Sequence, residues 1–156
     1  MKSVVNIHAT CVRLGRHGVL LLGKSGAGKS DLALRLIGRG AELVSDDRCD
    51  LSIERSRLVA RAPRTIAGLL EVRGVGIVRL DHVPFATIVL AVDLSGRVER
   101  MPEIGRYTPP KPLNLQRAGQ PRLISLNAFE PSAPEKIAAA LALSRQTGRR
   151  APVKCN

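Results

Sequence analysis

The sequence predicts an α/β domain with a central mixed sheet, and three features of the chain support this fold class. Residues 19–22 form an apolar run of strand length, and in residues 31–37 directly downstream Leu32, Ala33, Leu36 and Ile37 share one helical face. Residues 86–94 form a longer apolar run, which is typical of a buried strand. The length of 156 residues suits one domain with a substantial core. We therefore assign residues 1–144 to one domain and residues 145–156 to a basic, flexible tail.

Strands make up most of the predicted order of elements. Alternation of apolar and polar residues, or a short apolar run, identifies each of them. In chain order they are residues 4–14, 19–22, 41–45, 51–54, 58–61, 86–94 and 123–126. Residues 66–72 fit either a short helix or an extended segment, and residues 74–78 fit a bend that leads into a strand. We expect a long surface loop between Pro102 and Pro112, because prolines interrupt any regular pattern there.

Two helices complete this order. The first, at residues 31–37, is followed by glycines that end it. The second spans residues 132–144, where Ser132 can cap the N-terminus, Pro134 lies in the first turn and Glu135 follows three residues after the cap. Its sequence is apolar nearly all the way round, so we expect it to be buried on all sides.

A phosphate-binding motif lies between the second predicted strand and the first helix. Its residues, which we call the phosphate loop, are Gly23, Lys24, Ser25, Gly26, Ala27, Gly28, Lys29 and Ser30, and they match G-x-x-x-x-G-K-[ST] at every defined position. Its glycines let the backbone wrap closely, so that successive N–H groups and the helix N-terminus converge on a phosphate. Lys29 would reach the β- and γ-phosphates and the Ser30 hydroxyl would bind Mg²⁺. Strand, glycine loop and helix together are typical of a P-loop NTPase-like domain that binds a nucleotide.

A pair of aspartates follows the third predicted strand. Asp46 and Asp47 end that strand, at the edge where strands of α/β sheets meet a ligand. Adjacent side chains on a strand point in opposite directions, so the two would take different roles unless the backbone turns. One could serve a metal ion or water, and the other could accept a proton. The alternative is a turn or helix-capping pair, which aspartates also favour.

The formal net charge of +12 suits a phosphate-rich ligand or an acidic partner. It also suits unspecific binding to nucleic acid. Aromatic residues make up only 2% of the chain, however, which argues against a stacking platform for single-stranded nucleic acid. We assign most of the charge to solvated surface and part of it to the tail.

The three cysteines form neither a disulfide nor a zinc-binding spacing. Cys11 and Cys49 lie in apolar segments, so we expect them to be buried, whereas Cys155 in the tail would be free. No signal peptide and no apolar run long enough to span a membrane is apparent. These features predict a cytoplasmic protein with no membrane association.

A second motif points to a family. Glu71-Val72-Arg73-Gly74-Val75-Gly76-Ile77, with the spacing from His8 through Lys29 to Asp46-Asp47, resembles the C-terminal catalytic domain of the HPr kinase/phosphorylase family. The similarity covers residues 5–142. It implies an ATP- and Mg²⁺-dependent kinase that phosphorylates a serine of HPr, the small phosphocarrier protein of the phosphotransferase system. Many members also remove that phosphate by phosphorolysis. The resemblance further implies a fold related to phosphoenolpyruvate carboxykinases and a homo-oligomer, often a hexamer.

The resemblance also assigns roles around the nucleotide. The phosphate loop would hold ATP, and Lys29 would contact the transferring phosphate. Ser30 would bind one metal ion and Glu71 would be a further metal ligand. Asp46 is then the metal-ligand candidate beside them.

The same resemblance implies the proton chemistry. Asp47 matches the aspartate that deprotonates the acceptor serine, His8 matches a histidine near it, and Arg100 matches an arginine that stabilises phosphate charge. From the residues alone, His8 would be an ordinary strand histidine. Likewise, Glu71 and Arg73 would be a surface ion pair.

The chain departs from the family pattern at several positions. Asp31 stands where a longer glutamate is usual, and Lys24 is basic where an acid is common. The connection between residues 78 and 86 is short, so we expect a reduced grip on the protein substrate. Residues 109–115 resemble the segment linked to phosphorolysis only loosely, which favours kinase over phosphorylase chemistry. The resemblance includes no N-terminal domain, so we expect the regulation carried there to be absent.

The leading hypothesis is therefore an ATP-dependent serine kinase that acts on HPr or a related phosphocarrier. The first alternative is a nucleotide-binding sensor module with degenerate catalysis, which the short connection and the expected lack of an N-terminal domain would favour. A basic ATPase associated with nucleic acid is the third hypothesis. It rests on the net charge and is weakened by the scarcity of aromatic residues.

Overall fold

A computed structural model describes residues 2–147. Ten strands and two α-helices follow one another along this part of the chain. The strands are β1 (Val5–Leu14), β2 (His17–Leu22), β3 (Glu42–Ser45), β4 (Arg48–Glu54), β5 (Arg57–Arg61), β6 (Leu69–Val72), β7 (Gly76–Arg79), β8 (Ala86–Asp93), β9 (Gly105–Arg106) and β10 (Arg122–Ser125). The helices are α1 (Lys29–Gly38) and α2 (Ala133–Thr147), with short 3₁₀ turns at Arg64–Ile66 and Arg117–Gly119.

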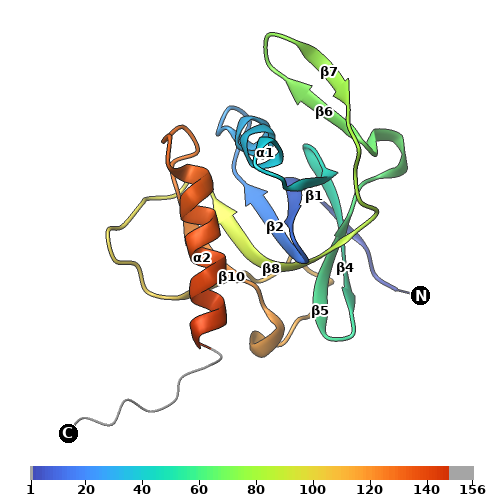
Figure 1. Ribbon diagram of the computed structural model, residues 1–156. Helices are drawn as coiled ribbons and strands as arrows, with labels where there is room; N and C mark the ends of the chain where they lie inside the picture. Colours follow the sequence, from blue (N-terminus) through green and yellow to red (C-terminus); the bar gives the residue numbers. More distant parts are fainter. Residues whose placement is uncertain (1, 148–156) are drawn as a thin grey trace, which may run out of the picture.

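Eight of the strands form one mixed sheet, which confirms the predicted α/β class. The pairing order is β2-β1-β4-β5-β8-β10-β9, and a further pairing of β2 with β8 closes the first part of this path into a ring. β8 pairs in parallel with β2 and β10, whereas β1 pairs antiparallel with β2, β3 and β4. The remaining strands, β6 and β7, form a separate hairpin, which projects beyond the sheet in Figure 1.

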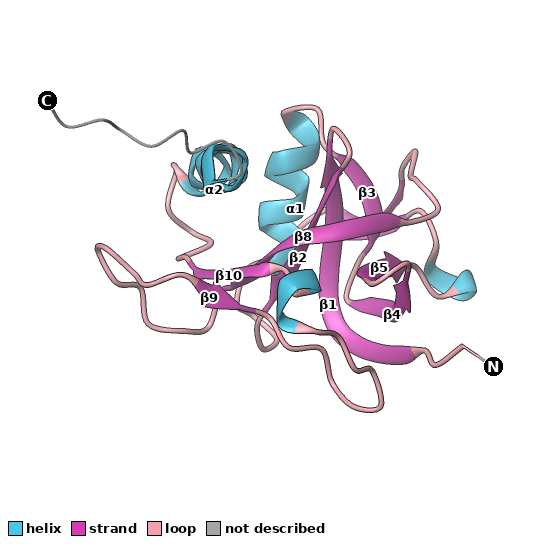
Figure 2. Cartoon of the chain, turned by 90° about the horizontal axis from the view of Figure 1, so that it is seen from below, coloured by secondary structure: helices cyan, strands magenta, loops and turns pink. Residues whose placement is uncertain are grey.

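The core has two parts, and β2 contributes to both because its side chains alternate between two buried faces. Val19 and Leu21 pack with the apolar sides of α1 and α2, and Leu20 packs inside the ring of strands. Both helices cover the same face of the sheet, as Figure 2 shows. A strand buried on both faces needs an unbroken apolar sequence, and β2 has one from Val19 to Leu22.

β1 changes partner along its length, and this change positions the site. Its first residues, Val5 to His8, pair with β4, while its later residues pair with β2 and β3. The register on β3 shifts between Cys11 and Val12. As a result His8 lies opposite Arg48, directly beside the aspartate pair that joins β3 to β4.

The sequence left open whether residues 66–72 form a short helix or an extended segment. In the structure, Ile66 ends a single 3₁₀ turn, and the second half of the segment is extended as β6, which pairs with β7. β4 begins at Arg48, earlier than the predicted residue 51, because its first residues pair with β1. The loop between Pro102 and Pro112 contains only the two-residue strand β9.

The prediction that α2 is buried on all sides is wrong. Ala133, Ile137 and Leu141 are buried at a spacing of four, whereas Leu143 is 44% exposed. The exposed positions also include Ala138, Ala139 and Ala142. α2 packs on α1 and the sheet with one face only, and alanine is apolar without requiring burial.

Helix α2 also continues to Thr147, past the expected boundary at residue 144. The rest of the predicted tail, including Cys155, lies outside the described residues. Cys11 and Cys49 are buried, as predicted. Within residues 2–147, no helix is both long and apolar enough to cross a membrane.

Candidate active site

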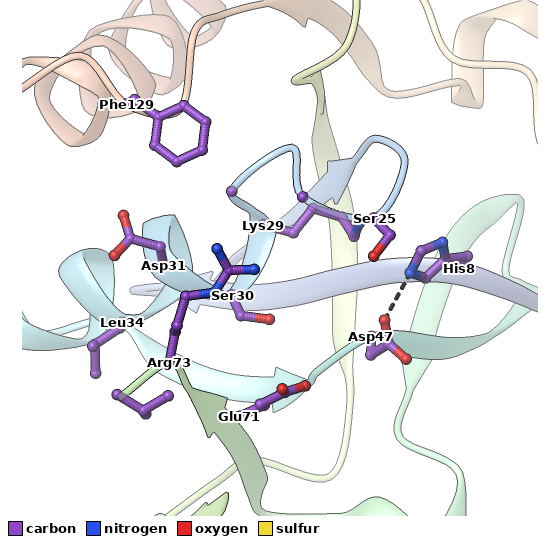
Figure 3. A pocket seen from close by; sticks show the side chains of 13 residues that line it. His8, Ser25, Lys29, Ser30, Asp31, Leu34, Asp47, Glu71, Arg73 and Phe129 are labelled. Atoms are coloured by element: carbon purple, nitrogen blue, oxygen red, sulfur yellow. Dashed lines mark hydrogen bonds and ion pairs between the residues drawn. The ribbon is translucent and has the colours of Figure 1, made fainter. Parts of the chain in front are cut away.

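A pocket of about 360 Å³ lies where the phosphate loop, β1, the β3–β4 turn and the β6–β7 hairpin meet (Figure 3). Segments far apart in the sequence therefore share one cavity. The residues that line it are His8, Ser25, Gly26, Gly28, Lys29, Ser30, Asp31, Leu34, Asp47, Glu71, Val72, Arg73 and Phe129.

The backbone of the phosphate loop is hydrogen-bonded to the side chain of its own lysine, Lys29. The Lys29 ammonium donates to the carbonyl oxygens of Gly23 at 2.6 Å and Lys24 at 3.2 Å, and the residue is 6% exposed. Burial lowers the pKa of Lys29, while the carboxylates of Asp47 and Asp46 act in the opposite direction. This places a partly desolvated cation at the centre of the loop, where it can exchange the two carbonyls for phosphate oxygens.

Gly28 holds a position that no other residue fits. Its φ of 94° is in the left-handed region, and it is the residue from which α1 begins. An added Cβ would lie 2.8 Å from Cβ of Ala128 and 3.1 Å from the Phe129 ring. The loop therefore needs glycine here both for its backbone angle and for its close contact with residues 128–129.

Asp46 is buried at the back of the pocket and fully hydrogen-bonded. Its Oδ1 accepts from the hydroxyls of Ser30 at 2.7 Å and Thr10 at 3.0 Å, and its Oδ2 accepts from the Glu71 backbone N–H at 3.0 Å. One carboxylate thus connects β1, α1 and β6. It orients the Ser30 hydroxyl and holds Glu71 at the edge of the pocket.

Asp47 points the other way, because the backbone turns between the two aspartates. Its φ is 66°, and its main chain is held by Ala9 and by the Thr10 hydroxyl. The side chain is 65% exposed, and its Oδ1 lies 2.7 Å from Nε2 of His8. Asp47 is thus a solvent-facing carboxylate on the pocket, with an imidazole as its hydrogen-bonding partner.

Most of the predicted site residues lie together, and one does not. His8, Lys29, Ser30, Asp47 and Glu71 line the pocket, and the buried Asp46 lies directly behind them. In the phosphate loop, Ser25, Gly26 and Gly28 also line it, while Gly23, Lys24 and Ala27 build the loop behind them. Arg100 lies in the exposed segment between β8 and β9, outside the residues that line the pocket.

Sequence reasoning missed several lining residues, above all Phe129. This residue comes from the loop between β10 and α2 and belongs to no motif. Its residue type was the one feature of the sequence that could have drawn attention to it, because the chain has only two phenylalanines and one tyrosine. Leu34 also lines the pocket, although its sequence pattern assigned it only to the first helix.

The oxygen donors at the pocket suit a hard divalent cation such as Mg²⁺. They are the Ser30 hydroxyl and the Glu71 carboxylate, with the Asp46 carboxylate directly behind them, which accepts hydrogen bonds from the Ser30 hydroxyl and from the Glu71 backbone N–H. Among residues 2–147, no group of three or more His, Cys, Asp or Glu side chains is arranged to hold a metal ion. Mg²⁺ is commonly held by one or two protein oxygens together with substrate phosphates, so this sparse set fits it.

The fold and the site define an α/β protein in which a glycine-rich loop, a helix N-terminus and several carboxylates face one pocket. The model of the HPr Serine kinase C-terminal domain matches residues 1–90, and the chain belongs to this family.

Proteins named HPr kinase/phosphorylase are similar to this chain over part of their length. The chain is 44% identical to an HPr kinase/phosphorylase of Clostridium beijerinckii over 72 residues, which is 46% of this chain and 24% of that protein. It is 41% identical to one from Halalkalibacterium halodurans over 97 residues, 57% of this chain and 31% of that protein. The chain thus spans under a third of the length of the curated relatives it matches.

A solved structure extends the similarity to nearly the whole chain. The structure of the Hpr(Ser) kinase/phosphatase from Coxiella burnetii aligns with a TM-score of 0.70 and 26% identity, covering 92% of this chain and 97% of that one. The share of the chain covered by this structure is larger than that covered by the family model, which ends at residue 90.

Proposed function

We propose that this chain is an ATP-dependent serine kinase domain that transfers the γ-phosphoryl group to a serine of HPr or a related phosphocarrier. One observation carries the proposal: the exposed carboxylate of Asp47 and the phosphate loop line the same pocket. The family supports the substrate class, since the relatives are named HPr kinase/phosphorylase. A P-loop NTPase-like fold related to phosphoenolpyruvate carboxykinases is part of this proposal.

The loop and Lys29 bind and orient the triphosphate. The backbone N–H groups of the loop face the phosphates, and the Lys29 ammonium leaves the carbonyls of Gly23 and Lys24 to contact phosphate oxygens. Fixed donors of this kind stabilise the charge that develops on the transferring group without reorganising.

Asp47 acts as the general base that accepts the proton of the acceptor serine. The acceptor serine oxygen forms a bond to the γ-phosphorus, the bond from that phosphorus to the β–γ bridging oxygen breaks, and ADP leaves. The serine proton passes to the Asp47 carboxylate, which His8 keeps oriented through its 2.7 Å contact. A carboxylate is basic enough for this task, because the serine oxygen loses its proton late in a loose transition state.

Ser30, Asp46 and Glu71 would hold magnesium. When bound, the ion neutralises charge on the β- and γ-phosphates. Asp46 orients the Ser30 hydroxyl for this purpose, and its own burial prevents that carboxylate from turning away. Glu71 presents its side chain to the pocket from β6, beside Asp46.

The test is phosphotransfer from labelled ATP to purified HPr in the presence of Mg²⁺, followed by mapping of the modified residue. Asp47→Asn should keep ATP affinity and lower the transfer rate by about 10²–10⁴-fold, the usual worth of general base catalysis. Asp81→Asn, an exposed aspartate outside the pocket, is the control and should transfer at the normal rate.

Two other results of this assay would contradict parts of the proposal. ATP binding without transfer to HPr would contradict the kinase proposal and favour a nucleotide-dependent sensor module. Normal turnover by Asp47→Asn would remove Asp47 from the role of base. Adding inorganic phosphate to phosphorylated HPr in the same assay measures phosphorolysis, in which Asp47 would return the proton to the serine.

A further inference from the structure

The ring of Phe129 lies over the phosphate loop, and residues 2–147 leave most of it exposed. The residue is 64% exposed and lines the pocket near the start of α1 (Figure 3). It is also in close contact with the loop, since a Cβ on Gly28 would meet its ring at 3.1 Å. A large exposed aromatic ring at a polar pocket calls for a physical reason, because the core of this protein is almost entirely aliphatic.

The segment that carries Phe129 is held in place. The Arg35 guanidinium, on α1, donates to the carbonyl of Ala128 and, at 3.2 Å, to that of Glu130, so it holds both neighbours of Phe129. The Phe129 N–H donates to the Asn127 side chain at 3.0 Å, and Ala128 is buried. The ring is therefore presented by an anchored backbone, which lowers the entropy lost when a ligand stacks on it.

The pocket also has two chemically different ends. His8 and Asp47 lie on one side of Lys29, and the Phe129 ring lies on the other, as Figure 3 shows. A triphosphate gripped at Lys29 with its terminal phosphate toward Asp47 would extend its remaining part toward Phe129.

The geometry points to Phe129 as the stacking platform for the nucleobase. This inference rests on the proposed nucleotide-binding function and adds the residue that would bind the base. Stacking uses the flat face that every base has, so this platform alone predicts similar affinities for ATP and GTP.

The experiment compares Mg-ATP with Mg-tripolyphosphate by titration calorimetry. Phe129→Ala should weaken ATP binding about tenfold, the usual effect of removing one stacking partner, and leave tripolyphosphate binding unchanged. Phe129→Trp should restore ATP affinity. Phe85→Ala is the matched control, because Phe85 is the only other phenylalanine, lies outside the pocket and packs against Arg61 at 5.2 Å.

The outcomes separate this inference from the proposed function. If the natural protein binds ATP no more tightly than tripolyphosphate, or if Phe129→Ala keeps full ATP affinity, the base subsite is overturned and the phosphate site stands. If Phe129→Ala loses affinity for both ligands equally, the ring supports the loop and does not bind the base. Failure of the natural protein to bind either ligand would overturn the nucleotide function and the subsite together.

Discussion

Asp46 and Asp47 are neighbours in the chain, yet their surroundings give them opposite characters. Asp46 is 6% exposed and accepts three hydrogen bonds, from Thr10, Ser30 and the Glu71 backbone. A buried carboxylate is tolerated only with such partners, because desolvation otherwise costs several kcal/mol. Asp47 is exposed and contributes one side-chain contact, to His8. At the residue scale, Asp46 holds Ser30 and Glu71 in position, and the exposed carboxylate of Asp47 is free to accept a proton.

This contrast predicts different effects of the same substitution on stability. Asp46→Asn replaces one acceptor oxygen with an NH₂ group that faces a donor, so it should lower the free energy of unfolding by about 1–3 kcal/mol. Asp47→Asn should change it by less than about 0.5 kcal/mol, since the side chain is exposed and asparagine tolerates the positive φ there. Urea denaturation of both variants measures the difference. Equal losses would contradict the division of roles.

At the scale of elements, the phosphate loop is held by its neighbours as much as by its own sequence. The Lys24 N–H donates to the Ser95 hydroxyl at 3.1 Å, beyond the end of β8, and the loop contacts Ala128 through Gly28. The end of β8 is itself stabilised by Asp93, which accepts from the Ser95 N–H at 2.9 Å. The loop conformation thus depends on β8 and on the segment before α2.

Two glycines of this loop provide a matched pair of substitutions. Gly26 and Gly28 both have positive φ, 85° and 94°, but a Cβ on Gly26 would meet nothing within 4 Å. Gly26→Ala should therefore cost only the backbone strain, about 1–2 kcal/mol. Gly28→Ala should cost about 1–3 kcal/mol more, because it also clashes with Ala128. Thermal or urea denaturation tests this order, which identical losses for the two variants would refute.

At the scale of the whole molecule, the two helices cover one face of the sheet and the strands enclose a second core inside their ring. Cys11 and Cys49 belong to this second core and are fully buried. Burial raises the pKa of both thiols, that of Cys49 to about 12, and the Ser45 hydrogen bond acts on Cys49 in the opposite direction. The folded state therefore keeps these thiols neutral where an unfolded chain would ionise them.

This difference predicts a loss of stability in alkaline solution. A pKa that is higher in the folded state means that unfolding releases a proton above pH about 8.5, so the free energy of unfolding falls as pH rises from there toward 12. For Cys49 the loss between pH 7 and pH 10 should be on the order of 2 kcal/mol. Comparing the natural protein with Cys49→Ala by urea denaturation at both pH values isolates this part. The prediction fails if both proteins lose stability equally.

Much of the local structure was predictable, because periodicity reports which side of a segment is buried. It identified β1, β2 and β8 and both helices, within a few residues of their ends. It was wrong about the burial of α2, since an alanine-rich sequence looks buried whether or not a partner covers it. It also missed the first residues of β4, whose assignment depends on pairing with β1.

The sequence by itself determined most of the local elements, and together with the family resemblance it named most of the predicted residues that lie at the candidate site, because the phosphate loop and the aspartate pair carry short-range patterns. Only the tertiary structure decided what each residue faces. It brought His8 to Asp47, buried Asp46 against Ser30, left Arg100 outside the pocket and laid Phe129 over Gly28. These outcomes depend on strand pairing and packing between residues distant in the chain, and no local pattern encodes such contacts.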